Sequence, residues 1–197
     1  FMPVELIGHR GAAGVAPENT LPSFRRALAD GLCQVELDVR LTLDGELVCF
    51  HDDRLDRITP QTGRVAEWAW AALSAVPVLP GAFGGAYPDA RIPLLSQVFA
   101  GLPEDCRYLV ELKADPVRPA DVVERTLAVI AAAGAGDRCR LISFDADLLR
   151  LARGAGSEIP LGFIAGARDR HRLLPVGKEV RAFALHLQHS AIDAPFL

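Results

Sequence analysis

Two carboxylates that lie two residues apart, Glu36 and Asp38, are the residues in the sequence that point most directly to a binding site. Side chains two apart in a strand point to the same face, about 7 Å apart along the chain. Such alternation is also typical of the solvent-exposed face of an antiparallel sheet. If the flanking residues Val35, Leu37 and Val39 face helices, however, both carboxylates point inward. Inward carboxylates are costly unless a cation lies between them.

A second strand-like segment repeats this pattern with Glu111 and Lys113, because Val110 and Leu112 supply the alternate apolar positions. A third carboxylate would complete a set of oxygen ligands of the kind that Mg²⁺ or Ca²⁺ prefers. Lys113 would add a point charge for an anion. A Glu-Lys pair on a strand without a special role is the alternative, and the repetition favours the metal site. We therefore predict one divalent cation, Mg²⁺ or Ca²⁺, held by the three carboxylates.

His51 is a candidate for acid-base chemistry at this cation. The dipeptide Asp44-Gly45 is typical of a two-residue hairpin turn. Such a turn would pair Asp38 with His51 and so place the imidazole beside the carboxylates. A single histidine is more often a structural residue, but one placed opposite an inward carboxylate is a better catalytic candidate.

His9 and Arg10 form a second candidate pair, directly after an apolar segment near the N-terminus. Arg10 could bind a phosphate through two parallel hydrogen bonds, and His9 could exchange a proton with a bound group. Gly11 would let a ligand approach the backbone. Taken alone, these residues also fit an ordinary polar loop.

The elements that must position these residues alternate between strand-like and helical patterns, which indicates parallel strands joined by crossover helices. We expect six parallel strands, over residues 4–8, 34–42, 107–112, 140–144, 161–164 and 182–187. The expected helices cover residues 21–30, a segment starting near 96, 119–133 and 146–153. This order predicts an α/β fold, the (β/α)₈ barrel of TIM type, whose chemistry lies at the carboxyl ends of the strands.

The length suggests that part of this barrel is absent. A barrel of this type usually has about 250 residues, and the chain has 197. We expect residues 1–197 to form a single, C-terminally incomplete barrel domain that lacks the last two strands and begins another helix at 193–197. Residues 52–93 contain many turn residues and are expected to form an insertion after the second strand, with a short helix near 67–75.

Composition excludes several other functions. The net charge is −4 and no long run of Lys or Arg occurs, which argues against a nucleic-acid groove. The longest uncharged stretch, 68–88, is interrupted by Pro and Gly and gives no membrane anchor. No secretory signal pattern is visible, so we expect a cytoplasmic protein. Four widely spaced cysteines form no metal-binding pair, and the oligomeric state stays open.

Seven short motifs occur in an order and spacing that resemble the glycerophosphodiester phosphodiesterase family, over roughly the first three fifths of the chain. They are His9-Arg10-Gly11, Pro17-Glu18-Asn19-Thr20, Glu36-Leu37-Asp38-Val39, Thr42-Leu43-Asp44-Gly45, His51-Asp52, Leu55-Asp56-Arg57 and Glu111-Leu112-Lys113. Each motif alone is weak, but the ordered set is specific.

The resemblance implies a metal-dependent hydrolase that cleaves small glycerophosphodiesters to an alcohol and glycerol 3-phosphate. It implies His9 and His51 as the acid-base pair, Glu36, Asp38 and Glu111 as metal ligands, Arg10 and Lys113 as phosphate-binding residues, and Asn19 as a residue that supports the ligands. The insertion would overhang the barrel and shape the pocket for the leaving alcohol. The absent strands would remove substrate contacts from that side.

Two other functions stay open at this point. One is a related barrel phospholipase that acts on lipid headgroups, although no basic amphipathic helix for membrane binding is evident. The other is a catalytically silent barrel that binds a phosphorylated ligand. The presence of both histidines and all three carboxylates favours an enzyme, because a binding protein needs no paired acid and base.

Overall fold

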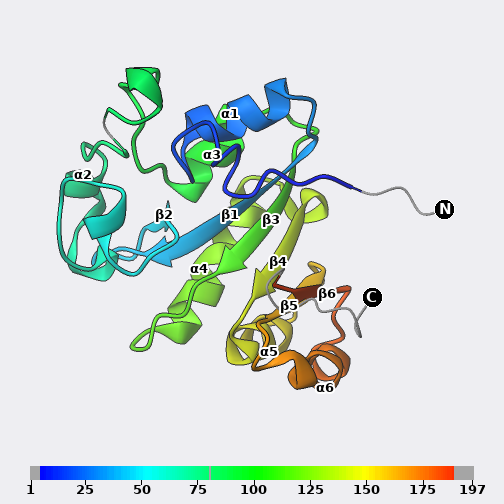
Figure 1. Ribbon diagram of the computed structural model, residues 1–197. Coiled ribbons are helices and arrows are strands. Elements are labelled where there is room, and N and C mark those ends of the chain that lie inside the picture. Colours follow the sequence, from blue (N-terminus) through cyan, green and yellow to red (C-terminus); the bar gives the residue numbers. More distant parts are fainter. Residues whose placement is uncertain (1–4, 80, 189–197) are drawn as a thin grey trace.

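A six-stranded sheet with the order β2-β1-β3-β4-β5-β6 forms the centre of the computed structural model, which describes residues 5–79 and 81–188 (Figure 1). The strands are β1 (Gln34–Leu41), β2 (Leu47–Cys49), β3 (Arg107–Leu112), β4 (Cys139–Ser143), β5 (Leu161–Ala165) and β6 (Ala184–Leu187). β1 and β3 to β6 are parallel to their neighbours, and β2 runs antiparallel to β1. This succession is that of a barrel, and among the described residues the sheet stays open.

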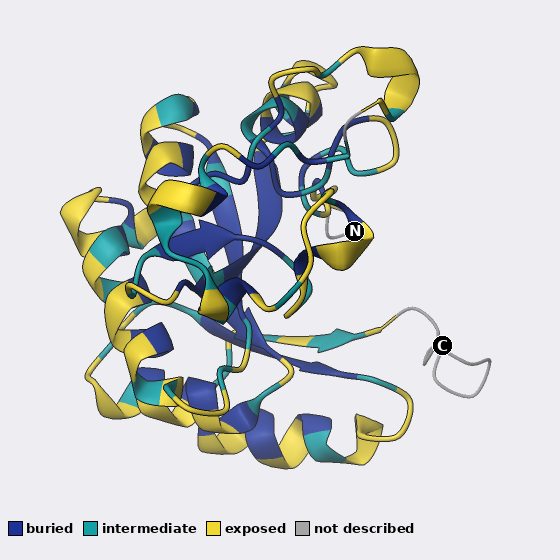
Figure 2. Cartoon of the chain, turned by 90° about the vertical axis from the view of Figure 1, so that its left-hand side faces the viewer, coloured by how far each residue is buried: buried dark blue, intermediate teal, exposed yellow. Residues whose placement is uncertain are grey.

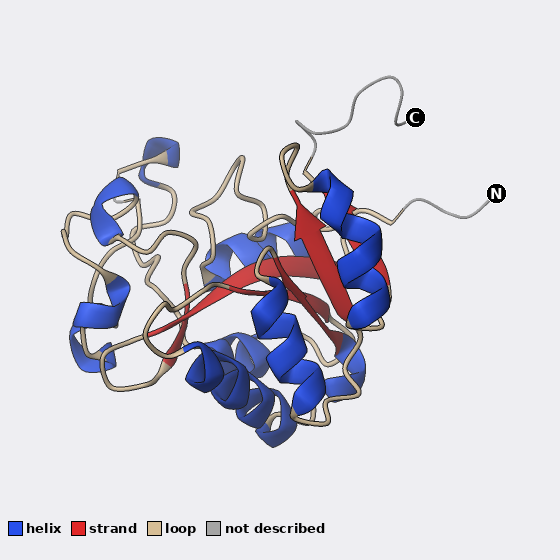
Figure 3. Cartoon of the chain, turned by 90° about the horizontal axis from the view of Figure 1, so that it is seen from below, coloured by secondary structure: helices blue, strands red, loops and turns tan. Residues whose placement is uncertain are grey.

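Helices cover one face of this sheet (Figure 3). They are α1 (Leu21–Ala29), α3 (Leu95–Gly101), α4 (Pro119–Ala132), α5 (Ala146–Gly154) and α6 (Leu173–Glu179), whereas α2 (Trp70–Leu73) packs in a separate cluster beside the sheet. All except α2 contribute to one apolar core with alternate strand residues. Figure 2 shows the strands buried, except for the partly exposed β6, and the outward helix faces exposed. As expected from its sequence, α1 begins after Thr20, whose side chain accepts a hydrogen bond from the backbone of Ser23.

The period of two in each strand divides its side chains between the two faces. Val35, Leu37 and Val39 lie in the helix-facing core, as the sequence predicts. Leu109, Ile142 and Ile164 form a separate apolar cluster from three other strands. The carboxylates of β1 and β3 therefore lie on the face opposite the helices.

The expected first strand is wrong in its extent. Among the described residues it is reduced to one parallel bridge between Gly8 and Val35, and residue 4 lies outside them. The sheet has five parallel strands besides this bridge rather than six. Residues 5–7, ahead of the bridge, are exposed, so they gain no buried contacts that would hold them in the sheet. Directly after the bridge the chain turns sharply, because Arg10 and Gly11 take positive φ angles of 51° and 81°.

The hairpin between β1 and β2 also differs from the expected one. Its register pairs Val39 with Cys49, so the connection is a three-residue loop closed by Thr42 and Glu46 rather than a two-residue turn. Gly45 takes the positive φ of 78° that such a loop requires. Asp38 consequently faces Phe50, whose backbone N–H donates to its carbonyl at 3.0 Å, and not His51.

The expected insertion has a hydrophobic cluster of its own. Val48 and Phe50 on the β2 side pack with residues such as Leu55, Leu73 and Ile92. The short helix expected near 67–75 is found as α2. This segment projects beside the sheet, at the left of Figures 1 and 3.

The C-terminal part contains one helix that the sequence patterns did not indicate, α6, whose Leu173 and Val176 pack into the main core. The helix expected to begin at residue 193 lies outside the described residues. In the described part of the chain, no helix is both long and apolar enough to span a membrane.

Gly11 provides a test of this account of the first loop. A Cβ atom there would lie 2.5 Å from Ser23 Oγ and 2.6 Å from the Ser23 carbonyl carbon, at a positive φ. We expect Gly11→Ala to lower the free energy of unfolding by about 2–4 kcal/mol. Gly14→Ala is the matched control, because a Cβ at Gly14 meets no atom within 4 Å. Urea unfolding measures both, and equal stabilities would contradict the tight packing of Gly11.

Candidate active site

Three buried carboxylates converge on the sheet face opposite the helices. Asp38 in β1 is the direct register partner of Glu111 in β3, and Glu36 lies two residues earlier on the same face of β1. One oxygen from each lies within 4.8 Å of the others. The strand pairing therefore brings these three side chains together, as the sequence predicts.

Burial makes this cluster electrostatically unfavourable without added positive charge. Burial, followed by the charge of Asp38, raises the pKa of Glu36 well above its usual range. Burial also raises the pKa of Glu111. Burial acts to raise the pKa of Asp38 as well, but the charge and hydrogen bonding of Lys113 lower it overall. Three acidic groups thus share a space where each disfavours ionisation of the others.

Lys113 is the cation that partly compensates them. Its Nζ lies 2.8 Å from Asp38 Oδ1 and also forms an ion pair with Glu111. Asp38 Oδ1 is buried and, despite this close approach, accepts no hydrogen bond of good geometry. Three hard oxygen donors, an under-satisfied buried oxygen and excess negative charge fit a divalent cation well.

Arg10 approaches the carboxylates from the loop after the Gly8 bridge. Its positive φ directs the backbone N–H at Glu36 Oε2, which accepts the hydrogen bond at 2.9 Å. The guanidinium lies between two carboxylates, with Nη1 donating to Glu18 at 2.9 Å and Nε 3.5 Å from Asp38 Oδ2. His9, the preceding residue, has a largely exposed side chain, and its Nε2 lies 3.8 Å from Glu36 Oε2.

Asn19 forms two hydrogen bonds with Asp38. Its Nδ2 donates to Asp38 Oδ2 at 2.7 Å, and its Oδ1 accepts from the Asp38 backbone N–H at 3.2 Å. Asn19 has a positive φ of 56°, an uncommon conformation that asparagine tolerates better than most residues. The amide therefore fixes the orientation of one carboxylate.

His51 follows β2 and lies near the same cluster. Its Nδ1 lies 2.6 Å from Asp52 Oδ1, and its backbone carbonyl accepts from Arg40 Nε at 2.9 Å. Burial lowers the pKa of His51, while the hydrogen bond with Asp52 acts in the opposite direction. A carboxylate on Nδ1 leaves Nε2 as the ring atom free to face a ligand.

Arg57 links the two halves of the site, a role that the sequence patterns did not indicate. Its Nε donates to Asp52 at 2.6 Å, while Nη1 and Nη2 each donate to Glu18 at 2.8 Å. Glu18 also accepts from Arg10. A continuous chain of hydrogen bonds therefore runs from His51 to Arg10. These linking residues all belong to the seven motifs, but only folding brings Glu18 and Arg57 together.

Asp52 gives this chain of bonds a measurable pH dependence. Burial acts to raise the pKa of Asp52, but hydrogen bonds from Arg57 and His51 lower it to about 2. Ionised Asp52 therefore stabilises the fold above its unfolded-state pKa of about 3.9, and the contribution is lost as the pH falls towards 2.

We expect Asp52→Asn to lower the free energy of unfolding by about 1–2 kcal/mol at neutral pH, after allowance for solvent screening. The gap between variant and wild type should close between about pH 4 and pH 2. Denaturant unfolding over that pH range measures it. Asp30→Asn is the control, because Asp30 forms an exposed pair with Arg26 within α1. A gap that stays constant with pH would contradict the assigned interaction.

Two curated relatives illustrate what this chain is similar to. YqiK from Bacillus subtilis is 34% identical over 148 residues, which cover 75% of this chain and 60% of that protein. A glycerophosphodiester phosphodiesterase from Caldanaerobacter subterraneus is 32% identical over 162 residues, which cover 81% of this chain and 65% of that protein. The chain thus spans less than two thirds of the length of either relative.

Solved structures of other proteins superpose on this fold. A phosphodiesterase from Oleispira antarctica, in complex with the product sn-glycerol-3-phosphate, superposes with a TM-score of 0.89 and 28% identity, over 96% of this chain and 77% of that one. A glycerophosphodiester phosphodiesterase from Thermotoga maritima gives a TM-score of 0.72 and 25% identity, over 95% of this chain and 75% of that one.

The sequence model of the glycerophosphoryl diester phosphodiesterase family matches residues 9–196, nearly the whole chain. This match extends well beyond the seven motifs, and together with the structural likenesses it confirms the barrel class of the fold. The chain belongs to the glycerophosphoryl diester phosphodiesterase family.

Proposed function

We propose that this site hydrolyses glycerophosphodiesters to an alcohol and glycerol 3-phosphate. The observation that carries the proposal is the convergence of Glu36, Asp38 and Glu111, with their oxygens within 4.8 Å, beside two histidines and two cationic side chains. The name of the Caldanaerobacter relative and the product bound to the Oleispira enzyme support the same substrate class.

In this proposal, Glu36, Asp38 and Glu111 hold one divalent cation, Mg²⁺ or Ca²⁺, because all three offer hard oxygen ligands. When bound, such a cation withdraws electron density from a phosphoryl oxygen. Asn19 keeps Asp38 in place through its two hydrogen bonds, and the Arg10 backbone does the same for Glu36. The carboxylates are therefore preorganised before any ligand arrives.

Arg10 and Lys113 bind the phosphate oxygens of the substrate. Both cations already lie at the carboxylates, with Lys113 Nζ 2.8 Å and Arg10 Nε 3.5 Å from different oxygens of Asp38. Preformed cations at the position where negative charge grows stabilise the transition state of an in-line displacement. The hydrogen bond from Arg10 to Glu18 fixes the guanidinium in this position.

His9 and His51 act as the acid-base pair. One protonates the departing alkoxide, and the other removes a proton from the attacking hydroxyl. Attack by water gives glycerol 3-phosphate directly, whereas attack by the substrate's own hydroxyl gives a cyclic phosphate that water then opens to glycerol 3-phosphate. The contact of His51 Nδ1 with Asp52 leaves Nε2 for this exchange. Arg57 is a positioning residue, because it holds Asp52 behind His51 and Glu18 behind Arg10.

Glu36→Gln tests the metal site. The variant keeps the shape of the side chain but removes a charge, so we expect turnover of glycerophosphocholine to fall by at least about 10²-fold while the melting temperature does not decrease. Calorimetric titration should show weaker Mg²⁺ or Ca²⁺ binding, and a chelator should abolish wild-type turnover. Glu46→Gln is the control, since Glu46 forms an ion pair with Arg125 on the hairpin. Full activity of Glu36→Gln at saturating metal would reject Glu36 as a needed ligand.

His9→Ala and His51→Ala test the acid-base pair. We expect each variant to lose about 10²-fold or more in kcat, because each removes a proton-transfer group. His171→Ala, in the exposed turn before α6, should keep wild-type kcat. Single-turnover rates at saturating substrate separate this chemistry from binding. A near-normal rate in either variant would exclude that histidine from the pair.

A further inference from the structure

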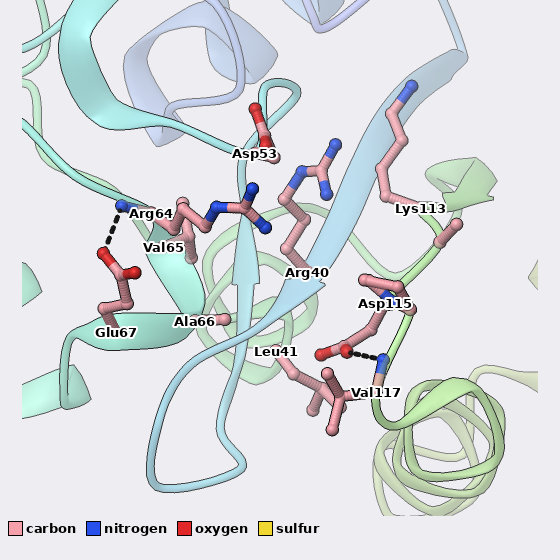
Figure 4. Close-up of a pocket in the computed structure, with 12 residues that line it drawn as sticks. Arg40, Leu41, Asp53, Arg64, Val65, Ala66, Glu67, Lys113, Asp115 and Val117 are labelled. Atoms are coloured by element: carbon pink, nitrogen blue, oxygen red, sulfur yellow. Dashed lines mark hydrogen bonds between the residues drawn. The ribbon is translucent and has the colours of Figure 1, made fainter.

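A cavity of about 430 Å³ lies between the insertion and the loop after β3 (Figure 4). This volume is in the range of small-molecule sites. Its charged lining residues are Arg40, Asp53, Arg64, Glu67, Lys113 and Asp115. The cavity lies next to the carboxylate cluster that binds the phosphate in the proposal above, and Lys113 belongs to both.

Two contacts show that the cavity adjoins the reacting centre. Lys113 lines it and at the same time reaches Asp38 Oδ1 at 2.8 Å. Arg40 lies two residues after Asp38 on the same face of β1, and its Nε donates to the carbonyl of His51 at 2.9 Å. A phosphodiester bound at the carboxylates therefore has one of its two ester groups within reach of this cavity.

The cavity offers mainly hydrogen-bond donors. In the described part of the chain, neither Arg40 nor Arg64 forms an ion pair with a carboxylate, and Figure 4 shows both guanidinium groups directed into the same space. Two of the lining carboxylates are already engaged. Asp115 accepts from the backbone of Val117 at 2.9 Å, and Glu67 accepts from the backbone of Arg64 at 3.0 Å.

Asp53 supplies an acceptor at the exposed edge of the cavity. Hydroxyl groups suit this combination, because each hydroxyl accepts from a guanidinium and donates to a carboxylate. A trimethylammonium group does not suit it, because such cations are held by aromatic rings. None of the residues that line the cavity is aromatic.

We infer that this cavity receives the leaving alcohol and selects a polyol, such as glycerol or inositol, over choline. The inference rests on the proposed phosphodiesterase function and adds the class of alcohol. Arg40 is the main specificity residue, since its Nε is fixed by the His51 carbonyl and its remaining donors face the ligand.

The test is a comparison of kcat/KM for glycerophosphoinositol, glycerophosphoglycerol and glycerophosphocholine in wild type and Arg40→Met. Wild type should prefer both polyol substrates by about tenfold or more, the effect of one charge-assisted hydrogen bond. Arg40→Met should lower kcat/KM for the polyol substrates about tenfold more than for glycerophosphocholine, because the lost hydrogen bond to the His51 carbonyl affects all three substrates alike. Arg125→Met, outside this cavity, should alter none of them.

Each outcome decides a different point. Equal kcat/KM for all three wild-type substrates, or an equal loss on all three in Arg40→Met, overturns the inference and leaves the phosphodiesterase function intact. No cleavage of any of the three, or of bis(p-nitrophenyl) phosphate, overturns both. If Arg40→Met melts below wild type, the same comparison is made with Arg64→Met, because Arg64 is exposed. We then expect kcat/KM to fall selectively for the polyol substrates.

Discussion

The burial of three carboxylates on one face of a parallel sheet is the constraint on which the rest of the site depends. Asp38 and Glu111 are neighbours by strand register, so their repulsion is built into the fold. Positive charge must approach this face, and Lys113 and Arg10 provide it. This requirement explains why two non-glycine residues of the first loop, Arg10 and Asn19, have positive φ angles. These backbone conformations cost free energy, but they direct hydrogen-bond donors toward the carboxylates.

The strand pattern allowed this cluster to be predicted from the sequence. Apolar residues at every second position identify the helix-facing side of β1 and β3, which leaves Glu36, Asp38 and Glu111 on the opposite side. The order of β1, β3, β4, β5 and β6 and of the helices α1, α3, α4 and α5 likewise follows from periodicity. These features are local, and local patterns are what a single sequence records best.

Other features could not be read because they depend on tertiary contacts or on closely balanced alternatives. Asp44-Gly45 suits both a two-residue turn and the observed three-residue loop, and the choice shifts the pairing of Asp38 by one residue. The predicted first strand is too long, because an apolar run does not reveal that, among its described residues, Gly8 alone pairs. The link from Glu18 to Arg57 joins residues 39 apart, which no periodic pattern records.

That link also has a consequence for how the molecule assembles. The loop that carries Glu18 and the insertion that carries Arg57 have separate hydrophobic contacts, one with α1 and the main core and the other with its own cluster. Closing a loop of this size costs chain entropy that local structure does not recover. We therefore expect the site to be completed late in folding, when two separately packed parts dock. Because the Glu18–Arg57 link joins them, we also expect both segments to lose protection together in hydrogen exchange.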